Sequence, residues 1–167
     1  MTTPPPYDPL LEARRLLRGI RVASLSTLMA QTGFPVGTLT TIAANEDGSP
    51  ILLLSQLSLH TRNLDADGRC SLLLAQTGKG DPLAHPRLTL VGTAIKVTEP
   101  QLRGQLRGIF LAQNPKAALY ADFGDFSFWQ FAITIAHLNG GFGKAADFTA
   151  ALLLGPAGPL PSANLPA

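Results

Sequence analysis

The chain has 167 residues, of which 46% are hydrophobic and 14% are charged, and its formal net charge at pH 7 is +2. This length is typical of one compact domain, and the small net charge argues against a nucleic-acid partner. The sequence has no run of about 20 apolar residues that could span a membrane, and its first residues show no basic segment leading into an apolar run, so we expect no secretory leader. We therefore expect a cytoplasmic domain with no membrane contact, and the low charged fraction predicts a homodimer in which a second subunit covers apolar surface.

The first predicted elements are helical. Residues 1–7 are rich in proline, and we expect them to form a disordered lead. Asp8 and Pro9 then begin a helix as its cap and its first residue, and Gly19 ends it. We expect residues 20–29 to be helical as well, because their apolar side chains recur near one face.

The hydrophobic period then changes to two, which is typical of strands. We expect strands at 36–44 and 51–54, joined by a turn at 45–50 whose Asp-Gly pair can supply the positive φ of a hairpin. A helix is expected at 58–66. The nearly continuous leucines of 70–76 predict a third strand that is buried on both faces.

The second half alternates in the same way. After a loop at 77–86, residues 87–97 are expected to form a fourth strand. Glu99 and Pro100 begin an amphipathic helix, and a second short helix is expected at 116–121.

The aromatic and β-branched residues of 126–138 then predict a long strand. Residues 142–154 fit a strand or a helix equally well. We expect the domain to comprise residues 8–154 and the segment 155–167, rich in Pro and Ala, to be a flexible tail.

These elements favour the α+β class, with an antiparallel sheet of five or six strands curled into a small barrel and helices gathered at its ends. A doubly wound parallel fold is disfavoured, because the strands are not each followed by a crossover helix. A Gly-rich loop after a first strand is also missing from the sequence. We therefore predict a small antiparallel β-barrel.

The segment 55–64 combines hydroxyls, an imidazole, a guanidinium and amides directly after a predicted strand. Side-chain donors, free backbone N–H groups and the positive end of a helix would all point at one spot there. We interpret this segment as the phosphate anchor of a nucleotide cofactor, although an ordinary helix cap would look similar. Cys70 is the one cysteine and is expected to be a buried core residue.

Several motifs in their order along the chain resemble those of a known superfamily. They are Gly37-Thr38-Leu39-Thr40-Thr41, Ser55 through His60-Thr61-Arg62-Asn63-Leu64, Cys70-Ser71-Leu72-Leu73-Leu74, Asp81-Pro82-Leu83, Arg87-Leu88-Thr89-Leu90-Val91-Gly92, Asn114-Pro115, Tyr120, Asp125-Phe126 and Gly140-Gly141-Phe142-Gly143-Lys144-Ala145. The chain thereby resembles the flavin-binding split-barrel superfamily of pyridoxamine 5'-phosphate oxidases and, within it, the haem-utilisation branch.

The resemblance implies a homodimer of six-stranded split barrels that binds FMN in two clefts between the subunits, and hence an FMN-dependent oxidoreductase. It places around the FMN phosphate Ser55, His60, Thr61, Arg62 and Asn63. It places along the flavin ring Thr38, Leu39 and Thr40, with Arg87 reaching in from the partner chain. The resemblance assigns no catalytic side chain and no metal ligand.

The sequence departs from the oxidases in one respect and leaves two alternatives open. No arginine follows Arg107, so the cationic clamp for a substrate phosphate is missing after the Phe-Trp-Gln motif, where Trp129 is expected to pack in the sheet. One alternative is a protein that binds haem in the same cleft, with His137 as the residue to test. The other is a dimeric scaffold with a vestigial cleft.

Overall fold

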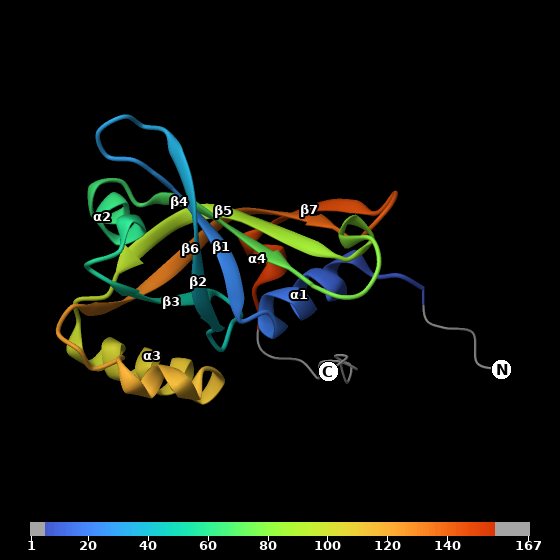
Figure 1. Cartoon of the computed structure of the whole chain (residues 1–167). Coiled ribbons are helices and arrows are strands. Elements are labelled where there is room, and N and C mark those ends of the chain that lie inside the picture. Colours follow the sequence, from blue (N-terminus) through green and yellow to red (C-terminus); the bar gives the residue numbers. More distant parts are fainter. Residues whose placement is uncertain (1–5, 156–167) are drawn as a thin grey trace.

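The computed structural model describes residues 6–155 (Figure 1). Its elements are α1 (Pro9–Gly19), β1 (Val22–Leu28), β2 (Pro35–Ala44), β3 (Pro50–Ser55), α2 (Leu59–Ala66), β4 (Arg69–Ala75), η1 (Pro82–Ala84), β5 (Arg87–Lys96), α3 (Pro100–Gln113), η2 (Pro115–Leu119), β6 (Phe126–Asn139), β7 (Ala145–Thr149) and α4 (Ala150–Leu153). Most of the predicted lead at 1–7 and of the predicted tail at 155–167 lies outside the described residues.

Six strands form a closed antiparallel barrel in the order β3-β2-β1-β4-β5-β6, and pairing of β3 with β6 closes it. The seventh strand, β7, pairs with β6 beyond the closure. The predicted α+β fold with a six-stranded antiparallel barrel and flanking helices is therefore confirmed. No helix in the described part of the chain combines the length and the apolar character that crossing a membrane requires.

The prediction of a helix at 20–29 is wrong, because most of this segment is strand β1. The buried positions are Ala23, Leu25 and Thr27, which alternate with more exposed neighbours as in a strand. Over so short a run, a helical and an alternating pattern share several positions, so pairing with both β2 and β4 decides the structure. The undecided segment 142–154 contains β7 followed by α4.

Local signals in the sequence explain the other boundaries. Asp8 caps α1, because its carboxylate accepts hydrogen bonds from the backbone N–H groups of Leu10 (2.9 Å) and Leu11 (3.1 Å). Glu99 caps α3 in the same way. Gly48 has φ +97° in the turn between β2 and β3, a conformation that favours glycine.

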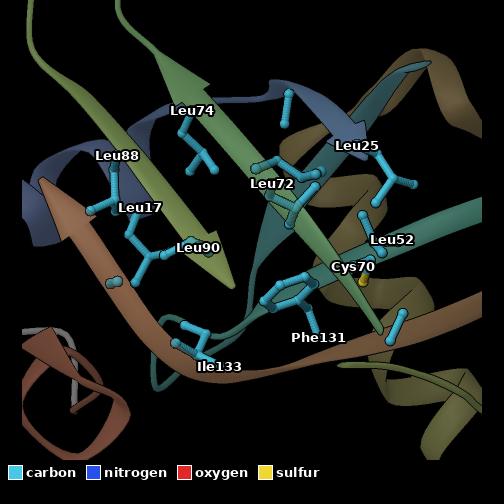
Figure 2. Packing of buried hydrophobic residues seen from close by; sticks show 14 of the residues in the cluster. Leu17, Leu25, Leu52, Cys70, Leu72, Leu74, Leu88, Leu90, Phe131 and Ile133 are labelled. Carbon is cyan, nitrogen blue, oxygen red and sulfur yellow. The ribbon is translucent and has the colours of Figure 1, made fainter. Parts of the chain in front are cut away.

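The buried hydrophobic side chains form two cores, one inside the barrel and one outside its wall. The first core fills the interior with side chains from the strands and from α1, including Leu17, Leu72, Leu88 and Phe131, and Figure 2 shows how they converge. Cys70 and Trp129 belong to this core with 8% and 2% of their surface exposed, which confirms both predictions.

The second core lies outside the barrel wall. It joins Leu106 and Phe110 of α3 to Ile51 of β3 and Phe128 of β6. The rings of Phe110 and Phe128 meet edge to face, with centroids 5.8 Å apart. Because α3 covers this side, β3 is buried on both faces.

Candidate functional site

The predicted phosphate anchor lies where β3 ends and α2 begins. Ser55 Oγ donates a hydrogen bond to Asp125 Oδ2 (2.6 Å) and accepts one from the Leu57 backbone N–H (3.1 Å). Arg62 donates from its guanidinium to the Leu57 carbonyl (2.9 Å). Ser58 occupies the N-cap of α2 but makes no capping hydrogen bond with its side chain.

The other predicted phosphate ligands point into the protein. His60, Thr61 and Asn63 are buried, with 9%, 0% and 3% of their surface exposed. Asn63 Nδ2 donates to Thr27 Oγ1 on β1 (3.0 Å), and Thr61 Oγ1 has no hydrogen-bond partner among the described residues. Arg62 is thus exposed and Ser55 half-buried. The side chains of His60, Thr61 and Asn63 point inward.

His60 is held as a neutral imidazole. Thr38 Oγ1 donates to the Leu25 carbonyl (3.1 Å) and lies 2.9 Å from His60 Nδ1, so we assign the ring proton to Nδ1. Burial disfavours the charged ring and lowers the pKa of His60 below its usual value. Thr38 and His60 therefore tie α2 to the barrel wall.

A hollow of about 310 Å³ lies next to Arg62. It is lined by Met29, Ala30, Gln31, Leu59, Arg62 and Asn63. The hollow is bounded by α2 and by the loop between β1 and β2, which projects beyond α2 in Figure 1. This hollow is the place beside the anchor segment that has room for a phosphate group.

The outer side of β2, β1, β4, β5, β6 and β7 carries a second candidate site, which we call the open face. The strand register places two rows of outward side chains across it. The first row is Leu39, Ser24, Leu73, Thr89, His137 and Asp147, and the second is Gly37, Ser26, Ser71, Val91, Ile135 and Thr149. Asp147 is the one acidic residue in these rows, and neither row contains lysine or arginine.

The open face exposes apolar surface that a single subunit leaves uncovered. Leu39, Leu73, Val91 and Ile135 have 74%, 40%, 46% and 43% of their surface exposed. A groove of about 340 Å³ crosses the same face and is lined by Ser26, Thr27, Leu28, Pro35, Arg69, Cys70, Ser71 and Val91. Exposed apolar side chains gathered on one face are typical of surfaces that contact a ligand or another subunit.

His137 and Asp147 form a pair at the β6–β7 edge of the open face. They are directly opposite each other in the register, and His137 Nδ1 lies 2.5 Å from Asp147 Oδ1. The side chains are 53% and 65% exposed. Nδ1 donates to the carboxylate, and Nε2 has no hydrogen-bond partner among the described residues.

Sequence reasoning singled out His137 but missed Asp147, because residues 142–154 had no assigned structure. A turn centred on Asn139-Gly140-Gly141 would pair residue 137 with residue 143, whereas the hairpin connection comprises residues 140–144 and pairs residue 137 with residue 147. The open face also separates three residues that the resemblance groups together, because Leu39 points outward whereas Thr40 is buried and Thr38 contacts His60. Arg87 begins β5, and its Nη1 donates to the Leu83 carbonyl (3.2 Å).

Comparison with known proteins gives a family and several relatives. The family model described as "CREG, beta-barrel" matches residues 8–152. The "Non-canonical heme oxygenase HOZ, chloroplastic" of Arabidopsis thaliana is 38% identical over 141 residues, which cover 83% of this chain and 42% of the relative. This chain therefore spans less than half the length of that relative.

Two solved structures share both the fold and part of the sequence. A heme binding protein from Mycobacterium smegmatis is 30% identical with a TM-score of 0.80, and the match covers 92% of this chain and 61% of that one. A protein of unknown function from Agrobacterium tumefaciens is 35% identical with a TM-score of 0.80, and the match covers 93% of this chain and 64% of that one.

Proposed function

Because the chain belongs to the CREG β-barrel family, whose split barrel is of the pyridoxamine 5'-phosphate oxidase type, we propose that it binds haem on the open face. The observation that carries this proposal is the combination of exposed apolar side chains with one free imidazole nitrogen on a face that α3 leaves uncovered. Two relatives support haem as the ligand, since one is named a heme oxygenase and another a heme binding protein.

The residues of the open face fit the chemistry of haem. Leu73, Val91 and Ile135 offer apolar contact to a flat macrocycle, and the small side chains of Ser24 and Ser71 leave room beside them. The open face thus combines apolar surface with His137 Nε2, a nitrogen that could ligate iron, and this combination is common in haem pockets. When bound, haem supplies redox or oxygen chemistry, and the protein supplies its position and surroundings.

A second copy of the chain completes the cleft in this proposal. Four exposed apolar side chains and two rows almost without charge suit close contact with an identical face. The partner would cover β1, β2, β4 and β5 and leave the β6–β7 edge at its border. Haem would then lie between the two subunits, in the interface cleft that the resemblance implies.

The test is a haem titration of the purified protein followed by the Soret band. We expect saturable binding in the wild type and its loss in Ile135→Asp, because a carboxylate on the open face would contact the macrocycle. Leu119→Asp is the matched control, since Leu119 is 78% exposed on η2 and lies outside the open face. Wild-type protein that shows no saturable binding, or an Ile135→Asp variant that binds as well as the control, would contradict the proposal.

FMN is the second candidate ligand, and the hollow beside Arg62 favours it. The guanidinium lines that hollow next to the first turn of α2, whose N-cap side chain makes no hydrogen bond to the turn. A phosphate there would meet a cation and helix N–H groups, and bound FMN would supply the chemistry of an oxidoreductase.

Arg62→Ala tests the FMN site directly. We expect it to weaken FMN binding by about 1.5 to 3 kcal/mol, the usual contribution of a charged hydrogen bond, which corresponds to roughly ten- to a hundredfold in Kd. Haem binding on the open face should not change. Colourless protein that takes up neither FMN nor haem would leave the vestigial scaffold as the remaining interpretation.

A further inference from the structure

If the open face binds haem, a residue of this chain is available to ligate the iron. The chain contains three histidines, His60, His85 and His137, and all of them lie in the described residues. No group of three or more His, Cys, Asp or Glu side chains within residues 6–155 could hold a metal ion by itself. A single side chain that could ligate the iron is therefore the feature to look for.

Two of the histidines are committed elsewhere. His60 is 9% exposed, and its Nδ1 is bonded to Thr38 within the barrel wall. His85 Nε2 lies 3.0 Å from the Lys79 carbonyl, in the loop before β5. The close approach of its ring to Gly78, where a Cβ would lie 2.7 Å from His85 Cε1, shows that this loop is folded tightly around the imidazole.

Cys70 borders the groove on the open face but is a poor ligand. Its side chain is 8% exposed, and burial raises the pKa of its thiol to about 11. The thiolate is the form that binds metals, and it is scarce at neutral pH under these conditions. The sulfur therefore stays protonated in the core.

His137 differs from the other two histidines in its exposure, its place on the open face and its hydrogen bond to a carboxylate. Its side chain is half exposed, it stands in the first row of the open face, and Ile135 on its own strand and Thr89 on β5 are its outward neighbours. Asp147 contacts Nδ1, which fixes the ring orientation and leaves Nε2 on the outward side of the imidazole.

We propose that His137 Nε2 would ligate the iron of bound haem and that Asp147 is the positioning residue behind it. The inference rests on the proposed function and adds the ligand. A histidine that donates its second ring nitrogen to a carboxylate is the usual arrangement at metal sites, and loss of such a partner weakens metal affinity by about 10- to 100-fold. The β6–β7 hairpin would therefore exist to hold this pair on the open face.

The experiment compares haem with iron-free protoporphyrin IX as probes of the same face. We expect His137→Ala to shift the Soret band and to weaken haem binding at least tenfold, with protoporphyrin IX binding unchanged, because only the iron bond is lost. Asp147→Asn should keep the Soret position and weaken haem binding by an intermediate factor. His85→Ala is the matched control and should behave as the wild type.

Each other outcome decides a different question. A wild-type protein that binds neither probe refutes the proposed function and this inference with it. Wild-type binding with an unchanged Soret band and affinity in His137→Ala refutes the ligand assignment and leaves the proposed function standing. Equal loss of both probes in His137→Ala also refutes the assignment, because the side chain would then act through packing and not through the iron.

Discussion

Val91→Asp tests whether the open face is a subunit interface. Val91 lies in the second row between Ser71 and Ile135, and its side chain is 46% exposed in the single subunit. Complete burial of an aliphatic side chain is worth about 1.5 to 3 kcal/mol, so burying the exposed part of each of the three large apolar residues that the partner would cover, Leu39, Leu73 and Val91, contributes roughly 1 kcal/mol. Twofold symmetry counts each side chain twice, so these contacts together contribute roughly 6 kcal/mol to association.

The aspartate would replace this gain with a penalty on both subunits. An uncompensated buried charge costs about 3 to 5 kcal/mol, and the variant would bury two of them. We therefore expect the dimer Kd to rise by at least about a thousandfold, since each 1.4 kcal/mol is a factor of ten. The fold should persist, because the position is half exposed in the monomer.

Sedimentation velocity across a dilution series measures the effect. The wild type and the control Leu119→Asp should sediment as dimers at concentrations where Val91→Asp sediments as a monomer. Circular dichroism should show the same secondary structure for all three proteins. A dimeric Val91→Asp variant, or a wild type that is monomeric throughout, would refute the reasoning about the open face.

Three further predictions concern the barrel. Gly92→Ala should lower the free energy of unfolding by about 1 to 3 kcal/mol, because a Cβ there would lie 2.0 Å from the Ala132 carbonyl oxygen at the β5–β6 bulge. Gly108→Ala on α3 is the control: a Cβ there would have no neighbour within 4 Å, so this variant should raise the free energy of unfolding by about 0.5 to 1 kcal/mol. Urea denaturation measures both changes. Cys70 should resist thiol reagents at pH 8 in the folded protein and react on unfolding, because burial raises its pKa to about 11, and fast labelling of the native state would contradict this. Burial lowers the pKa of His60, so below the usual value of 6.5 the unfolded chain binds a proton that the folded chain does not. The free energy of unfolding should therefore be full above that pH and fall as the pH drops below it. In urea titrations His60→Gln should flatten the dependence of this free energy on pH, and an equal dependence in both proteins would exclude His60 as its source.

Much of the fold was predictable because local signals agree with tertiary packing. The caps at Asp8 and Glu99 and the Asp47-Gly48 turn act within a few residues, so the sequence reveals them directly. Strand β1 was missed because its pairing partners, β2 and β4, decide a pattern that the segment itself leaves ambiguous. The closure of β3 onto β6 depends on contacts between residues more than 70 positions apart, such as Leu53 and Phe128.

The site was less predictable, for two physical reasons. The polar residues of the anchor segment carry no mark that separates a phosphate ligand from a buried hydrogen-bond partner, and the structure pairs Asn63 with Thr27 and His60 with Thr38. The role proposed for His137 depends on Asp147, and that pairing exists only in the register of the β6–β7 hairpin. Whether Arg62 holds a phosphate therefore stays a prediction.

The seventh strand has a consequence for handling the protein. Among the described residues β7 pairs with β6 alone, so the backbone groups along its other side are available to a strand from another chain. Its length of five residues and the charge of Asp147 both discourage such addition. The carboxylate that orients an imidazole thus also disfavours the addition of a foreign strand to the edge of β7, and light scattering should accompany every measurement on an Asp147 variant.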